Sequence, residues 1–266
     1  TNTTPSKTTM ISMSTTNPEF SVNFPTAIPV KEIALAQLRV YYSWPNIRSK
    51  PFGGLPANNS LVFANKNKPD GTPDWQIVSI PTGSYQLEQI NEEFQRRIKS
   101  ITGKESKIAI TVYEPTLSSV VEINSPDYMI DIYQSSIRSV LGWPDDAPSP
   151  IILKYNNDAY GTGRHISPNI VNITSTIALN LICDVVDGSY NVNAGKSNQA
   201  QQGYVLYSSS INSPPGWLIV SEPINQVYLR VHNPLLSRMN FKLTNQDGHI
   251  IDLHGETLYI NLYIRS

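Results

Sequence analysis

Three runs near the end of the chain alternate almost strictly between apolar and polar residues. Their apolar positions are Val227, Leu229 and Val231, then Met239, Phe241 and Leu243, and finally Leu258, Ile260, Leu262 and Ile264. A period of two is typical of a strand with one buried and one solvent-facing side. The pattern predicts that the chain ends in a two-faced β-sheet, with a hairpin turn at residues 245–248 after the second run.

The same alternation predicts strands through most of the chain. Phe20, Val22 and Phe24 alternate with polar residues, and a longer apolar run follows at residues 33–42. Shorter segments with strand character are residues 61–64, 75–80, 107–113, 120–124, 128–133, 172–186, 204–207 and 217–221. Many are bounded by Pro, Gly, Asn or Asp, which favour turns. The sequence therefore predicts an all-β protein.

The period changes to a helical one in residues 84–101. Apolar residues stand at Leu87, Ile90, Phe94, Ile98 and Ile101, between charged and amide residues. This spacing predicts one amphipathic helix that packs one face on a sheet. Thr82 or Ser84 would cap its start, and Gly103 follows its end. A short second helix is predicted at residues 135–141, ending at Gly142.

The two ends of the chain differ in composition. Residues 1–17 are almost wholly Thr, Ser, Asn and Lys, with too few large apolar residues for a core of their own. We predict a flexible N-terminal arm over residues 1–19, either a frayed terminus or a segment that orders on a neighbouring subunit. Residues 20–266 would form the folded domain, with inserted loops and the helix. Residues 145–170 are predicted to be a long surface loop.

Composition narrows the classes of partner and chemistry. The 266 residues carry a net charge of −1, and their Lys and Arg residues are scattered, which argues against nucleic acid as a principal partner. No apolar stretch is long enough to span a membrane. The single cysteine, Cys183, excludes an internal disulfide and a cysteine-based zinc site, and its apolar neighbours predict a buried structural thiol.

The sequence gives little support for a catalytic or metal-binding site. Asp247, His249, Asp252 and His254 are the closest grouping of potential metal ligands, but alternation on a strand would place them on opposite faces. Neither Asp184 with Asp187 nor Asp145 with Asp146 has a spacing that indicates acid–base catalysis. We predict no catalytic residues, no metal site and no cofactor.

The polar face of the closing strands is the better functional candidate. It carries Tyr228, Arg230, Tyr259, Tyr263 and Arg265. Tyrosine and arginine are enriched where proteins contact one another, although tyrosine is also common on exposed strands. These five residues are our candidate contacts for a neighbouring subunit.

Several motifs, taken in order, resemble one family. They are Phe20-Ser-Val-Asn-Phe-Pro before the run at 33–42, Ile80-Pro-Thr-Gly-Ser-Tyr before the helix, Ser136-Ile-Arg-Ser-Val-Leu-Gly-Trp, Leu181-Ile-Cys-Asp-Val-Val-Asp-Gly-Ser, and the turn Asp247-Gly248 with the last strand. This series resembles the penton, or minor capsid, proteins of polintons, adintoviruses and virophages. The ending Leu262-Tyr-Ile-Arg differs from the His-aromatic-Arg of that family, and residues 145–170 have no counterpart.

The resemblance implies a jelly-roll β-sandwich that forms homopentamers at the vertices of an icosahedral capsid. Its partners would be further copies of itself and the neighbouring major capsid protein. It would be located in the virion and would assemble inside the host cell. Three other interpretations remain open. One is a β-sandwich module that binds carbohydrate or protein through surface tyrosines and the loop at 145–170. The others are a host-domesticated assembly protein and a hydrolase on a β scaffold.

Overall fold

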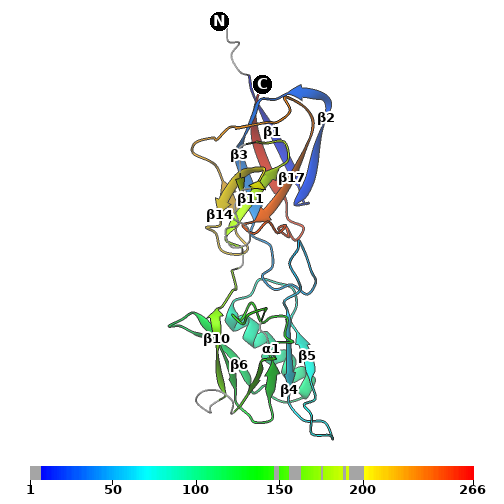
Figure 1. Cartoon of the computed structure of the whole chain (residues 1–266), viewed down its shortest axis with the longest axis vertical. Coiled ribbons are helices and arrows are strands. Elements are labelled where there is room, and N and C mark those ends of the chain that lie inside the picture. The colour runs from blue at the N-terminus through cyan, green and yellow to red at the C-terminus, as the bar shows by residue number, and fades with distance from the viewer. Residues whose placement is uncertain (1–6, 147–149, 156–162, 175, 188–189, 192–200) are drawn as a thin grey trace. The chain divides into compact units, whose positions relative to one another are not determined.

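The chain folds into two compact units (Figure 1). The computed structural model describes residues 7–146, 150–155, 163–174, 176–187, 190–191 and 201–266. The first unit combines Thr1–Trp44 with Thr176–Ser266, and the second is Pro45–Ser175. The second unit is therefore an insertion in the sequence of the first. In the described part of the chain, no helix is long and apolar enough to cross a membrane.

The first unit is built from two antiparallel sheets. One sheet has the order β1 (Thr8–Thr15), β18 (Leu258–Arg265), β3 (Glu32–Tyr41) and β15 (Leu218–Ser221), and the short β16 (Leu229–Arg230) also pairs with β3. The other sheet has the order β14 (Val205–Ser210), β11 (Ala178–Cys183), β17 (Leu235–Asn245) and β2 (Glu19–Pro29). Figure 1 labels β1, β2, β3, β11, β14 and β17 in this unit.

The strand order identifies the first unit as a jelly roll. If its eight main strands are counted along the chain, one sheet reads first, eighth, third and sixth, and the other reads fifth, fourth, seventh and second. The chain thus crosses repeatedly from one sheet to the other, as in the double Greek key of a jelly roll. The predicted all-β jelly-roll class is confirmed, and the insertion falls between the third and fourth of these strands.

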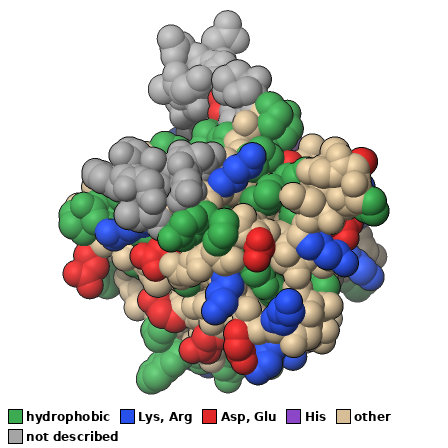
Figure 2. All heavy atoms as spheres, turned by 90° about the horizontal axis from the view of Figure 1, so that it is seen from below, with side chains coloured by type: hydrophobic (Ala, Val, Ile, Leu, Met, Phe, Trp, Pro, Cys, Tyr) green, Lys and Arg blue, Asp and Glu red, His purple; other side chains and the backbone are tan. Residues whose placement is uncertain are grey.

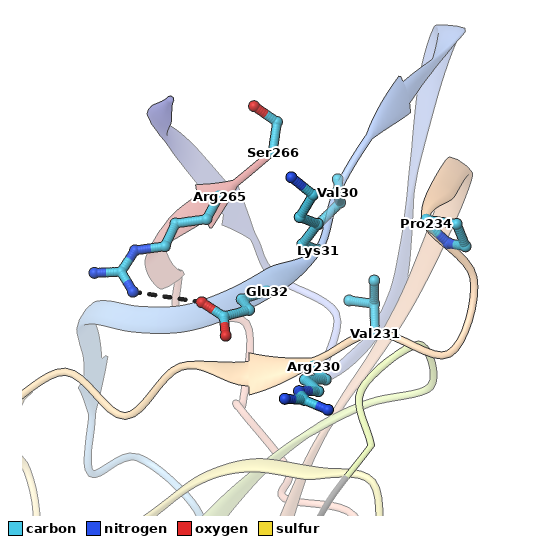
Figure 3. Close-up of a pocket in the computed structure, with 8 residues that line it drawn as sticks. All are labelled: Val30, Lys31, Glu32, Arg230, Val231, Pro234, Arg265 and Ser266. Carbon is cyan, nitrogen blue, oxygen red and sulfur yellow. Dashed lines mark hydrogen bonds and ion pairs between the residues drawn. The ribbon is translucent and has the colours of Figure 1, made fainter. Parts of the chain in front are cut away.

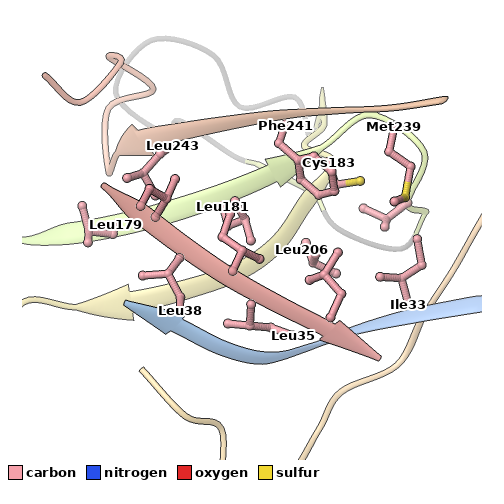
Figure 4. Close-up of a cluster of buried hydrophobic side chains, with 14 of the residues drawn as sticks. Ile33, Leu35, Leu38, Leu179, Leu181, Cys183, Leu206, Met239, Phe241 and Leu243 are labelled. Carbon is pink, nitrogen blue, oxygen red and sulfur yellow. The ribbon is translucent and has the colours of Figure 1, made fainter. Parts of the chain in front are cut away.

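The core of the first unit lies between the two sheets. Side chains from β3, β11, β14 and β17 meet there (Figure 4), and the apolar residues of β18 join the same cluster. The predicted buried positions of the last two alternating runs are confirmed, from Met239 to Leu243 and from Leu258 to Ile264. The first run is different, because Val227 is 68% exposed and only Leu229–Arg230 is a strand.

Part of the segment predicted as a flexible arm is a strand of the jelly roll. All eight residues of β1 lie opposite residues of β18, from Thr8 opposite Arg265 to Thr15 opposite Leu258. Ile11 and Met13 pack against the core from this strand. The other residues of β1 are mostly threonine and serine, which occur in edge strands as well as in loops. The sequence pattern therefore did not indicate a strand here. Residues 1–6 of the predicted arm lie outside the described residues.

The second unit holds the helix and two small antiparallel sheets. One sheet has the order β5 (Gln76–Ser79), β4 (Ser60–Ala64), β8 (Met129–Asp131) and β9 (Ile152–Lys154), and the other β10 (Arg164–Ile170), β7 (Ser118–Ile123) and β6 (Ile108–Tyr113). Its core is a separate cluster that shares no residue with the core of the jelly roll. The described chain also has a two-residue pair, β12 (Tyr190–Asn191) with β13 (Gln201–Gln202).

The predicted amphipathic helix is confirmed as α1 (Leu87–Thr102). Leu87, Ile90, Phe94 and Ile98 are buried, whereas Ile101 is half exposed. The predicted N-cap was wrong. Gln86 caps the helix, and its backbone amide donates to the Gln89 side chain in a capping box. Gly103 ends the helix in the left-handed conformation with φ 70°, as glycine at this position commonly does.

The second predicted helix, residues 135–141, is instead a series of turns. Its backbone hydrogen bonds have mixed spacing, with Arg138 donating to Ser135, Leu141 to Ile137 and Trp143 to Arg138. The Ser135 and Ser136 hydroxyls accept hydrogen bonds from the backbone of β4, from Val62 and Ser60. These contacts tie the segment to β4 and compete with regular helical bonding.

The loop predicted at residues 145–170 contains two strands, β9 and β10. Its residues 147–149 and 156–162 lie outside the described residues. Pairing with β8 and β7, rather than a clear alternation, defines these strands, which is why the sequence pattern missed them. Residues 145–170 therefore do not form one continuous surface loop.

Candidate functional site

A row of charged residues crosses three strands at one end of the first sheet. Glu32 of β3 lies opposite Arg265 of β18 on one side and opposite Arg230 of β16 on the other. The Arg265 guanidinium donates to the Glu32 carboxylate at an N···O distance of 3.4 Å. In the strand register Glu32 is thus flanked by two arginines, of which Arg265 pairs with its carboxylate.

Tyr228 joins this row from the residues just before β16. The guanidinium carbon of Arg265 lies 3.3 Å from the centre of the Tyr228 ring, an arrangement that favours a cation–π interaction. Arg265 is therefore held between an aromatic face and a carboxylate. Three of the five predicted contact residues, Tyr228, Arg230 and Arg265, are brought together by the strand order.

An open pocket of about 560 Å³ lies beside the row (Figure 3). Its charged lining consists of Lys31, Glu32, Arg230 and Arg265, and its apolar lining includes Val30, Val231 and Pro234. Figure 3 shows Arg265 reaching toward Glu32, whereas Arg230 and Lys31 point away from this ion pair. Among the described residues, neither Arg230 nor Lys31 has an ion-pair partner. We call this feature the cationic pocket, and its chemistry suits carboxylate groups of another molecule.

Tyr259 and Tyr263 do not line the cationic pocket. Both lie on β18, where Tyr263 is opposite Met10 and Tyr259 is opposite Ser14 of β1 and Arg39 of β3. Tyr259 is half exposed and Tyr263 half buried. They therefore belong to the outer face of the first sheet, which faces away from the core.

This outer face also carries apolar residues that the sequence pattern did not single out. Five of these residues are each between 40% and 57% exposed, namely Met10, Tyr41, Leu218, Val220 and Tyr259. Arg39 lies between Val220 and Tyr259 across the strands, and Leu218 lies opposite Tyr41. We call these five residues the outer-face patch. The continuous apolar run from Trp217 to Val220, with both faces apolar, was the available signal.

Residues considered for chemistry occupy structural positions. The Asn245 side chain accepts hydrogen bonds from the backbone amides of Asp247 and His249, and Asp252 accepts one from the amide of His254. The Asp184 carboxylate accepts from the backbone amide of Asn240 at 2.8 Å. Within the described ranges, no three His, Cys, Asp or Glu side chains are grouped so that they could hold a metal ion.

Cys183 is fully buried between the sheets, as the sequence predicted (Figure 4). Burial, together with the nearby Asp184 carboxylate, raises the pKa of its thiol to about 12, although a hydrogen bond from the Val185 backbone lowers it in part. A thiol with this pKa is protonated near neutral pH and is a poor nucleophile. Cys183 therefore acts as a small apolar residue of the core.

Charges of both signs are mixed on the surface shown in Figure 2. Acidic and basic side chains alternate there with apolar and neutral polar ones, without a broad region of one sign. Arg96 and Arg97 of α1, for example, both pair with Glu93, and the Arg96 guanidinium in particular holds the pKa of that carboxyl down at about 2. Local ion pairs thus occupy many of the charged residues.

Comparison with known proteins gave similarity at the level of structure alone. No protein-family model and no curated protein sequence matches the chain. The mavirus penton protein is similar over 98% of this chain and 99% of its own, with 11% identity and a TM-score of 0.46. A chain in the structure of the Sputnik virophage is similar over 97% of each chain, with 12% identity and a TM-score of 0.41. Both TM-scores are below 0.5, so the fold assignment rests on the strand order described above.

Proposed function

We propose that this chain is a structural subunit of a viral capsid, a penton-type minor capsid protein that assembles into homopentamers at the vertices. The proposal combines the jelly-roll topology with the ordered motifs that resemble penton proteins. The observation that carries it is the outer-face patch, since five large side chains on one sheet face are left substantially exposed in a single copy. Exposed apolar area on one face of this kind is typical of a surface that contacts another macromolecule.

Apolar and charged features of the first unit have complementary roles in this proposal. The outer-face patch supplies apolar area, which is the main source of association energy. The cationic pocket would fix the orientation of the two subunits, because Arg230 and Lys31 could each bind a carboxylate of the neighbouring copy only in one relative placement. Five copies around an axis would use one head-to-tail contact repeated five times.

The remaining parts of the function follow from that role. The neighbouring major capsid protein would contact the pentamer, the assembled protein would be located in the virion, and assembly would take place inside the host cell. The chain would act without catalytic residues or a cofactor. Tyr41 and Tyr259, exposed on one face, also suit the stacking of sugar rings, so a carbohydrate-binding module is the second candidate.

The proposal is tested by the mass of the native particle and by two matched variants. Val220→Asp places a carboxylate in the outer-face patch opposite Arg39, which lets the single subunit tolerate the charge. Ile224→Asp places the same charge at a residue that is 97% exposed outside the patch. We expect pentamers from the parent chain and from Ile224→Asp in native mass spectrometry, and folded monomers from Val220→Asp.

Two outcomes would contradict the proposal. The first is a parent chain that remains monomeric at every concentration and ionic strength tested. The second is a Val220→Asp chain that forms pentamers as readily as the parent. A monomeric parent with saturable binding on a glycan array would instead support the carbohydrate-binding module.

A further inference from the structure

Strand β1 is an edge strand without the usual protection. It is eight residues long and contains neither a charged residue nor a proline. It pairs with β18 on one side, and no other strand in the described part of the chain pairs with its second side. A long, uncharged edge is a ready template for a strand of another chain, and natural proteins usually block such edges.

Two other edges of the same unit, those of β2 and β15, are blocked in the expected ways. Strand β2 begins with Glu19 and contains Pro25 and Pro29, which cannot donate a backbone hydrogen bond. Strand β15 is four residues long and is followed directly by Glu222 and Pro223. The edge of β1 therefore differs from those of β2 and β15, whereas β14, an edge strand of six residues, is likewise without a charged residue or a proline.

The backbone groups that face the open edge can be assigned. The Ser266 amide donates to the Lys7 carbonyl at 3.2 Å, so the backbone groups of Lys7 point toward β18. In an antiparallel pair, successive residues point their N–H and C=O groups to opposite sides. Thr9, Ile11 and Met13 therefore bond to β18, while the open side presents the groups of Thr8, Met10, Ser12 and Ser14.

We propose that this open edge pairs with a strand from a second copy of the chain, so that a sheet continues from one subunit into the next. The inference rests on the proposed function and deepens it. A second copy is the occupant because the edge is continuous with the outer-face patch. Met10 belongs to both, since its side chain lies on the outer face and its backbone on the open edge. An apolar contact and a strand pairing then form one surface.

The test replaces one backbone donor and leaves the fold in place. Ser12→Pro removes an N–H that faces the open edge, and proline is tolerated on an edge strand when its missing donor faces solvent. Ser12→Ala removes the same side chain and keeps the N–H. We expect Ser12→Ala to assemble as the parent does, and Ser12→Pro to fold but associate at least about tenfold more weakly, as measured by native mass spectrometry across concentrations.

Hydrogen exchange on the parent chain gives a second readout that needs no variant. Upon assembly, the amides of Met10, Ser12 and Ser14 should become protected. The amides of Ile11 and Met13 should be protected in the single subunit already, because they bond to β18. Equal exchange of Met10, Ser12 and Ser14 before and after assembly would overturn the inference, as would full assembly of Ser12→Pro.

Failure of this inference differs from failure of the proposed function. If the parent forms pentamers in which the β1 amides stay unprotected, the capsid role stands and the edge pairing is wrong. If the parent never assembles, the proposed function fails and the edge pairing between copies fails with it. If the amides become protected only when an unrelated peptide is added, the occupant is not a second copy.

Discussion

Leu262 provides the sharpest test of how the closing strand is oriented. Its side chain is completely buried in the core of the jelly roll, and it lies opposite Ile11 of β1 and Leu35 of β3. The substitution Leu262→Asp removes an apolar side chain from the core and places a carboxyl group there. Tyr263→Asp, one residue along, places the same group on the outer face.

The magnitude follows from three contributions. Loss of the leucine side chain costs about 2–5 kcal/mol, as for other buried leucines. Protonating a carboxyl of ordinary pKa at about pH 7 costs roughly 4 kcal/mol, which limits the penalty for burying its charge. A buried neutral carboxyl without a partner costs about 1–3 kcal/mol more. The total is comparable to the whole stability of a domain, about 5–15 kcal/mol.

The assay is hydrogen exchange by mass spectrometry, supported by thermal unfolding. In Leu262→Asp, peptides from the first unit should lose protection, whereas peptides from α1 should keep it, because the two cores share no residue. The buried carboxyl would have a raised pKa in the folded state. The destabilisation relative to the parent should therefore shrink by about 4 kcal/mol as the pH falls from about 7 to about 4.

Tyr263→Asp is the matched control, and it should retain protection throughout the first unit. A Leu262→Asp chain that melts cooperatively within a few degrees of the parent would refute the assigned face of β18. Loss of protection in both units at once would refute the independence of the two cores.

Two further predictions concern other parts of the chain. Gly142 and Gly103 both have φ between 70° and 81°, but a Cβ at Gly142 would lie 2.3 Å from the Asn169 carbonyl oxygen, whereas one at Gly103 meets nothing within 4 Å. Gly103→Ala should therefore cost about 1 kcal/mol and Gly142→Ala several times more in thermal or urea unfolding, and equal costs would contradict the close approach. Cys183 should resist a thiol-modifying reagent at pH 8 until the first unit unfolds, because its pKa is raised to about 12, and rapid modification of the native chain would contradict its burial.

Local patterns in the sequence were enough to predict several elements correctly. The inward residues of β17 and β18 follow from strict alternation, because each apolar side chain there faces the core. The helix follows from its spacing, and its end from Gly103, since few other residues adopt a left-handed conformation easily. In each case the signal and the structure lie within one short segment.

Other features depend on partners that are distant in the sequence. Strand β1 is defined by pairing with β18, some 250 residues away, and five of its eight residues are Thr or Ser. Glu32 lies between Arg230 and Arg265 only because β16, β3 and β18 are neighbours in the sheet. The outer-face patch likewise joins four strands. Pattern reasoning found Tyr228, Arg230 and Arg265 as candidates but could not show that they converge.

The number of copies in the native particle tests the proposed capsid role most directly. Native mass spectrometry of the parent chain, over a range of concentrations and ionic strengths, measures that number. We predict a closed species with five times the mass of one 29.6 kDa chain. A chain that remains at the mass of one copy under every condition would contradict the capsid role.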